Sequence, residues 1–186
     1  MKTRRCVPLA FGLVTFCVAF SGIGNALEEG VSMATLQITS TDFEPNGVIP
    51  KKYTCEGEDV SVPLRWSEPP TGTKSFVLIS DDPDAPVGTW VHWVLYDLPP
   101  ETRELEEGLP KTEALPNGGK QGMTDFRRVG YGGPCPPPGS FHQYFFKLYA
   151  LDTKLNLPPK QTKQQLLKAM EGHLLAQGEL IGRYKR

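Results

Sequence analysis

Residues 141–151 read FHQYFFKLYAL and residues 90–96 read WVHWVLY, two segments in which apolar side chains stand at neighbouring positions. Because successive side chains of a strand point to opposite faces, a strand formed by either segment would be apolar on both faces. A third apolar run, SFVLIS, occupies residues 75–80. Strands of this kind belong to sheets that are covered on both sides, as in a β-sandwich. The three segments therefore predict a mainly β protein.

The residues around these segments favour many turns. The 186 residues include 19 glycines and 18 prolines, while 39% are hydrophobic and 22% are charged. This composition excludes a collagen-like chain, a simple helical bundle and a disordered chain. Residues 33–38 add a further candidate strand, and no internal repeat divides residues 27–186. We expect one domain with short strands and long connecting loops.

One helix is predicted near the C-terminus. Pro158 and Pro159 prevent an upstream helix from continuing into this region. Thr162 and Gln165 then have the spacing of a capping box. Apolar residues follow at helical spacing: Leu166, Leu167, Met170 and Leu174. The pattern predicts a helix that starts just after Thr162, and it leaves the end of that helix open.

Residues 1–26 have the pattern of a secretory signal peptide. They begin with MKTRRC, continue with an apolar run over residues 7–20, and end with small residues before Leu27. The alternative, a membrane anchor, is less favoured because a span needs roughly 18–20 apolar residues. We predict that cleavage after Ala26 releases a domain of residues 27–186 without a transmembrane segment, in the periplasm or outside the cell.

The charge of the exported part is mildly acidic. Three of the 20 basic residues and none of the 21 acidic residues lie in residues 1–26, so residues 27–186 carry a formal net charge of −4. Nucleic acids and anionic lipids attract proteins with basic surfaces. The balance therefore argues against nucleic acid as a partner.

Two cysteines, Cys55 and Cys135, remain after removal of the signal peptide. An even number of cysteines in an oxidising compartment favours a disulfide. This bond would close a loop of about 80 residues and contribute roughly 3–4 kcal/mol on the chain-entropy model. The alternative is two separate buried thiols.

Two stretches are unusually rich in polar groups beside prolines. Residues 81–86 read DDPDAP and are followed by Trp90-Val91-His92, while residues 131–144 read YGGPCPPPGSFHQY. Each stretch contains one histidine at a predicted strand. Without further information, each could be structural: a buried histidine, a turn at the aspartates, or a polyproline connector.

Strand periodicity predicts which way these histidines point. In a regular strand, His92 shares a face with Trp90, Val94 and Tyr96. By the same rule, His142 and Tyr144 share a face and direct two hydrogen-bonding groups the same way. We therefore expect the second histidine to act together with the tyrosine.

Together these stretches resemble the phosphatidylethanolamine-binding protein family, specifically its bacterial Raf-kinase-inhibitor-like branch. One family block resembles residues 82–86 with Trp90-x-His92, and another resembles residues 131–144. YTCEG at residues 53–57 and LIGRY at residues 180–184 are similar to segments of the bacterial members. The match covers residues 39–186.

The resemblance implies an antiparallel β-sandwich with a C-terminal helix and a small anion pocket at one end. In the family, this pocket accepts phosphate, phosphorylethanolamine and similar groups. Carried over to this chain, its wall comprises Asp82, Asp84, His92, Pro137, His142 and Tyr144. This chain differs in Gln143, which stands where arginine is common and which should point away from the pocket.

The resemblance further implies a non-enzymatic binding protein without a cofactor, which could modulate another protein. Its expected partner is a small phosphate-type anion or a phospholipid headgroup. Asp82 would either orient a histidine or hold the ammonium of a zwitterionic headgroup. The alternative is a hydrolase or metal-dependent enzyme that uses His92, His142 and Asp82. The protein partner and the oligomeric state, monomer or homodimer, stay open.

Overall fold

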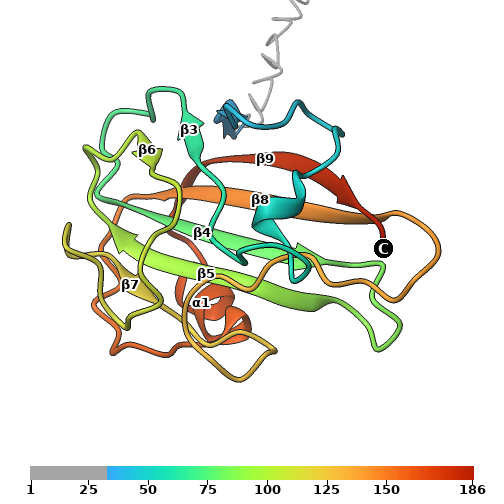
Figure 1. The fold of residues 1–186 in the computed structure, drawn as a ribbon. Helices are drawn as coiled ribbons and strands as arrows, with labels where there is room; N and C mark the ends of the chain where they lie inside the picture. The colour runs from blue at the N-terminus through green and yellow to red at the C-terminus, as the bar shows by residue number, and fades with distance from the viewer. Residues whose placement is uncertain (1–32) are drawn as a thin grey trace, which may run out of the picture. The chain divides into compact units, whose positions relative to one another are not determined.

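Two β-sheets face each other across a hydrophobic core in the computed structural model, which describes residues 33–186 (Figure 1). Within these residues, one sheet has the strand order β1-β9-β8-β4-β5-β7 and the other has the order β2-β3-β6. Neighbouring strands run antiparallel, except that β1 and β9 run parallel. The predicted mainly β sandwich with one C-terminal helix is confirmed. The predicted signal peptide, residues 1–26, lies outside the described residues.

The elements differ greatly in length. The strands and helices are β1 (Ala34–Thr35), β2 (Ile38–Thr39), the 3-10 helix η1 (Lys51–Tyr53), β3 (Leu64–Trp66), β4 (Ser75–Asp82), β5 (Trp90–Leu98), β6 (Glu104–Leu105), β7 (Lys120–Gln121), β8 (His142–Leu151), α1 (Lys163–Ala169) and β9 (Leu174–Tyr184). No helix among residues 33–186 is long and apolar enough to cross a membrane.

The three apolar runs of the sequence form the centre of the larger sheet, in the order β8-β4-β5. All eight residues of β4 are buried, because the sheet is covered on both faces. Phe76 and Leu78 belong to the core between the sheets. Val77 and Ile79 point the other way and pack in a second cluster with Leu166 of α1. The apolar runs thus predicted both the strands and their double coverage.

The helix begins where the capping box predicted, but it ends earlier. The Thr162 hydroxyl accepts a hydrogen bond from the Gln165 backbone, and the Gln165 side chain accepts one from the Thr162 backbone. The assignment of Leu174 to this helix is wrong, since α1 ends at Ala169 and Leu174 begins β9. Leu174 instead lies against the cluster that contains the apolar residues of α1. A helical spacing of apolar residues therefore continued by chance into a strand.

The N-terminal candidate strand, residues 33–38, is divided between the two sheets. β1 pairs with β9, whereas β2 pairs with β3 in the smaller sheet. Between them the chain crosses close to Gly178 of β9, where an added Cβ would lie 1.9 Å from the Leu36 carbonyl oxygen. Glycine at this position permits the close approach. The prediction of one continuous strand here is wrong.

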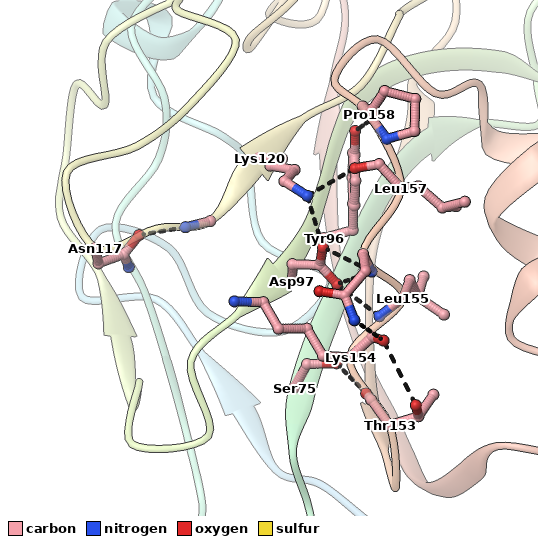
Figure 2. A network of polar contacts seen from close by, with 12 residues as sticks. Ser75, Tyr96, Asp97, Asn117, Lys120, Thr153, Lys154, Leu155, Leu157 and Pro158 are labelled. Carbon is pink, nitrogen blue, oxygen red and sulfur yellow. Dashed lines mark hydrogen bonds and ion pairs between the residues drawn. The ribbon is translucent and has the colours of Figure 1, made fainter.

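A buried carboxylate fixes the connection between β8 and α1 (Figure 2). Asp97, at a φ of 55° in β5, accepts hydrogen bonds from the backbone N–H of Leu155 at 2.8 Å and of Asn156 at 3.1 Å. The Lys120 ammonium lies 3.1 Å from the same carboxylate and donates to the Leu157 carbonyl at 2.7 Å. The network therefore ties three separate segments together: β5, β7 and the loop before α1.

Candidate functional site

The end of β4 and the starts of β5 and β8 lie together at one end of the larger sheet (Figure 1). A cavity of about 270 Å³ lies there. Its polar lining comes from Asp82, His92 and His142, and the disulfide residue Cys135 adds to the wall. Its apolar lining comes from Ala85, Pro86, Val87, Trp90, Phe126, Pro136 and Pro137. The two unusual stretches of the sequence therefore meet around one cavity.

His142 and Asp82 form a buried hydrogen-bonded pair. The His142 Nδ1 lies 2.8 Å from Asp82 Oδ2, and both side chains are less than a tenth exposed. Because a carboxylate only accepts hydrogen bonds, Nδ1 carries the proton and Nε2 is the nitrogen left for another partner. The other oxygen, Asp82 Oδ1, accepts from the Asp84 backbone N–H at 2.8 Å. Asp82 thus orients the imidazole, which is one of its two predicted roles.

His92 is held by a backbone carbonyl instead of a carboxylate. Its Nδ1–H donates to the Gly132 oxygen at 2.7 Å, which again leaves Nε2 as the second ring nitrogen. Burial lowers the pKa of His92, because the charged imidazolium is poorly solvated there. The rings of Phe126 and Tyr144 both meet the His92 ring edge-on, with centroids 5.2 Å away. His92 is therefore a fixed and preferentially neutral group.

The face predicted for His92 is right with respect to Trp90, which lines the same cavity, but wrong with respect to Val94 and Tyr96, because the strand is irregular there. Ser80 of β4 pairs with Trp93, but the next residue, Asp81, pairs with Val91, so a β-bulge leaves His92 as the extra residue. Trp93 packs in the core between the sheets, whereas Val94 lies on the outer face. The bulge breaks the simple alternation and directs His92 toward Tyr144. A regular strand would have placed His92 with Val94 and Tyr96.

Tyr144 lies beneath the cavity and has an unsatisfied hydroxyl. The side chain is 1% exposed, and its oxygen has no hydrogen-bond partner within residues 33–186. Burial raises the pKa of Tyr144 strongly, and the negative charge of Asp82 raises it further. The phenol therefore stays protonated and is a potential donor. A buried unpaired hydroxyl costs about 1–3 kcal/mol. The Asp82 carboxylate is the nearby acceptor, and a hydrogen bond to it also raises the pKa of Tyr144.

The six predicted site residues do not all touch the cavity. Asp82, His92, Pro137 and His142 line the cavity. Tyr144 is outside the lining, and its ring packs against the ring of His92. Asp84 is exposed, and its carboxylate accepts from the Gln143 backbone N–H at 2.8 Å, so it joins the loop after β4 to β8.

Sequence reasoning missed Phe126, whose loop carries no motif. Its neighbour Asp125 accepts from the Val91 backbone at 2.7 Å, which fixes the loop at the cavity.

The predicted disulfide is present and forms part of the pocket wall. Cys55 and Cys135 are bonded, with their Cα atoms 5.4 Å apart. Beside it, the Cys55 N–H donates to the Pro134 carbonyl at 3.1 Å, and the Gly133 N–H donates to Asp59 at 2.6 Å. These contacts hold residues 131–137 against the segment that follows η1. The pocket wall is therefore cross-linked to a distant part of the chain.

Reduction of this disulfide should lower the free energy of unfolding by about 2–4 kcal/mol, because the bond closes a loop of 80 residues in the unfolded chain. Denaturant unfolding with and without a reductant measures the effect. The double variant Cys55→Ser/Cys135→Ser is the control, since its stability should not respond to the reductant. Equal unfolding midpoints for the oxidised and reduced wild type would contradict a stabilising role.

Two other arrangements do not bring the motif residues together. A larger hollow of about 570 Å³ lies beside β1, β8 and β9, but none of the predicted site residues lines it. Among residues 33–186, no group of three or more histidine, cysteine, aspartate or glutamate side chains is arranged to hold a metal ion. The polar groups of the motifs converge only at the smaller cavity.

Comparison with known proteins points to one family. The family model described as phosphatidylethanolamine-binding protein matches residues 39–185. A UPF0098 protein of Aquifex aeolicus is 52% identical over 155 residues, covering 82% of this chain and 90% of that protein. A UPF0098 protein of Pyrococcus abyssi is 46% identical over 186 residues, covering 98% of this chain and 99% of that protein.

Two crystal structures have a similar fold. A putative phosphatidylethanolamine-binding protein homolog from Chlamydia trachomatis superposes with a TM-score of 0.75 at 41% identity, covering 82% of this chain and 98% of that chain. E. coli YbcL, described as a new member of the mammalian PEBP family, superposes with a TM-score of 0.76 at 32% identity. The superposition covers 82% of this chain and 99% of that chain.

Proposed function

Because the chain belongs to the phosphatidylethanolamine-binding protein family, we propose that its cavity is a non-enzymatic binding site for small phosphate-type anions, free or as a headgroup. The observation that carries this proposal is the His142–Asp82 pair, which directs an imidazole nitrogen to the cavity. Asp82 also supplies a negative charge to accompany an imidazolium at that position. Such a charged donor forms stronger hydrogen bonds to an oxyanion than a neutral one does.

Neighbouring groups support an oxyanion in this place. The Tyr144 hydroxyl is a protonated donor that lies close to the Asp82 carboxylate. His92 presents a second ring nitrogen, and its other nitrogen is occupied by Gly132. An anion in the cavity that accepts from a histidine would share the imidazolium charge.

Anion binding at this site requires a proton. In the unliganded protein the Nδ1–H groups of both histidines are used, so a neutral Nε2 is an acceptor and faces another acceptor in the ligand. One Nε2 must therefore gain a proton when a fully ionised anion binds. Burial disfavours the charged form of His92, whereas the Asp82 carboxylate lies beside the His142 ring.

The affinity for sulfate should fall as pH rises between about 6 and 8, by up to about tenfold for each pH unit. The sign follows from proton uptake: binding is favoured where protonated histidine is available and is lost as the proton is removed. Sulfate is the probe because, unlike phosphate, it does not itself titrate in this range. Isothermal titration calorimetry in buffers of different ionisation enthalpy measures both the affinity and the proton uptake.

His173→Ala is the matched control for this experiment. His173 also hydrogen-bonds an aspartate, Asp152, at 2.7 Å, but the pair is about half exposed and does not line the cavity. Its removal should leave the pH profile unchanged. Sulfate binding that is independent of pH in the wild type would contradict proton uptake at the pocket histidines, and absence of binding to both sulfate and phosphate would refute the anion site.

The same proposal includes an exported location. The signal pattern of residues 1–26 directs the chain to the periplasm or outside the cell. A disulfide in the pocket wall is stable in such an oxidising compartment. There the site would meet free phosphate compounds and lipid headgroups, and occupancy of the cavity could modulate a protein partner.

A further inference from the structure

We propose that the Cys55–Cys135 disulfide is a site of reversible thiol–disulfide exchange, at which a dithiol reductant opens the bond in the folded protein and loosens one wall of the cavity. The effect on anion affinity rests on the proposed anion site, whereas the exchange itself does not. Three features carry the proposal: the exposure of both cysteines, the position of Cys135 in the wall, and the few other contacts of the chain that follows it.

The disulfide lies at the surface of the pocket wall. Cys55 and Cys135 are both exposed, although the residues just before them, Thr54 and Pro134, are buried. Exchange requires a thiolate to approach one of the two sulfur atoms, and exposed disulfides are the ones that exchange most easily. A reductant can therefore reach this bond without unfolding of the protein.

The chain before Cys135 stays attached without the disulfide. Residues 131–134 are all buried. The Tyr131 hydroxyl donates to the Tyr53 carbonyl at 2.9 Å, and further backbone hydrogen bonds join these residues to β5 and to the segment that follows η1. Opening of the bond would therefore leave this side of the pocket wall in place, and the protein would stay folded.

The chain after Cys135 is held much less firmly. Among residues 33–186, every hydrogen bond made by residues 135–140 goes to Arg186. Its Nε donates to the Pro136 carbonyl at 2.6 Å, and its backbone carbonyl accepts from the Gly139 N–H at 3.2 Å. This stretch supplies Pro136 and Pro137 to the cavity lining. Without the disulfide, this part of the wall would be hydrogen-bonded to a single residue.

The exchange is balanced with a dithiol as the co-reactant. One thiolate of the dithiol attacks a cysteine sulfur, the S–S bond breaks, and the other cysteine leaves as a thiolate that takes up a proton. The second thiolate of the reagent then attacks the mixed disulfide, which releases the first cysteine and turns the reagent into a disulfide. The protein gains two electrons and two protons, and transfer to a disulfide oxidant reverses the reaction.

Thiol release by dithiothreitol tests whether the bond opens in the folded protein. A thiol-reactive dye follows the reaction. We expect the folded protein to be reduced within about tenfold of the rate of the urea-unfolded protein, because both sulfur atoms can be reached. Low urea concentrations should leave this rate unchanged. Reduction that occurs only as fast as global unfolding, and that accelerates with urea as unfolding does, would overturn the proposal.

Hydrogen exchange detected by mass spectrometry locates the loosening. Reduction should speed exchange in the peptide that covers residues 135–141 by at least about tenfold, because local opening exposes these amides. Exchange in β4 should stay unchanged, since that strand is buried and far along the chain from the disulfide. Equal acceleration in both regions would indicate global destabilisation and would overturn a local effect on the wall.

Calorimetric titration with sulfate at pH 6.5 measures the consequence for binding. Reduced protein should bind about three- to tenfold more weakly than oxidised protein, because the ligand binds only the molecules whose wall is in place. The double variant Cys55→Ser/Cys135→Ser should bind like the reduced wild type and should not respond to dithiothreitol. Circular dichroism at the temperature of the titration checks that both proteins are folded.

The outcomes separate the two proposals. Equal sulfate affinity of the oxidised and reduced protein would overturn the link between the disulfide and the pocket. Absence of sulfate and phosphate binding to the oxidised wild type would refute the anion site instead, and the thiol kinetics and hydrogen exchange would still decide whether the disulfide opens in the folded protein.

Discussion

Asp97→Ala should lower the free energy of unfolding by about 3–5 kcal/mol, because it removes the acceptor on which the loop before α1 depends. The Asp97 carboxylate is fully buried and binds two backbone N–H groups and the Lys120 ammonium (Figure 2). The substitution leaves those donors without a partner and leaves a cavity. It also places alanine at a φ of 55°, a backbone conformation that aspartate tolerates better.

Denaturant unfolding of the wild type and of three variants, Asp97→Ala, Asp97→Asn and Asp152→Ala, measures this effect. Asp97→Asn keeps one oxygen acceptor but loses the charge that Lys120 neutralises. Its free energy of unfolding should therefore lie between those of the wild type and Asp97→Ala. Asp152→Ala is the control for loss of an exposed pair, since the Asp152 carboxylate bonds the half-exposed His173 side chain; it should cost less than about 1 kcal/mol. A loss in Asp97→Ala no larger than in Asp152→Ala would contradict the role given to the network.

The Asp97 network could not be predicted from the sequence. The bonds join residues 58 and 59 positions apart, and no local pattern identifies an aspartate as the partner of a distant loop. The strand β9 was missed for a related reason. Its glycines look unfavourable for a strand, but Gly178 is required where the chain crosses at Leu36, and Gly182 where Ile49 packs closely. Both requirements come from the tertiary fold.

The predicted elements were those whose evidence is local. Apolar runs identified β4, β5 and β8, and a capping box identified the start of α1. Prolines and histidines in two motifs identified most of the cavity, through resemblance to a family. The orientation of His92 could not be predicted by periodicity, because the bulge between β4 and β5 changes which face each side chain occupies. Phe126 could not be predicted either, since only the folded loop brings it to the histidine.

The bonds of Asp82 separate two roles that the sequence left open. Because Asp82 holds His142, Asp82→Asn should weaken phosphate and phosphorylethanolamine binding by the same factor. A carboxylate that held an ammonium would instead make the loss larger for phosphorylethanolamine. The comparison of the two ligands thus tests whether Asp82 orients His142 or binds an ammonium group. Removal of the histidine tests whether the cavity binds anions.

His142→Ala should weaken phosphate binding by about ten- to hundredfold, since a hydrogen bond from a charged donor contributes roughly 1.5–3 kcal/mol. Calorimetry at pH 6.5 measures the loss, and His173→Ala should bind like the wild type because His173 lies outside the cavity. The substitution also leaves the buried Asp82 carboxylate without its partner, which could unfold the pocket. The double variant His142→Ala/Asp82→Asn removes that buried charge. If the loss of binding persists in the double variant while its thermal midpoint returns toward that of the wild type, the missing donor is responsible. Equal phosphate affinity in the wild type and His142→Ala would refute the pocket assignment.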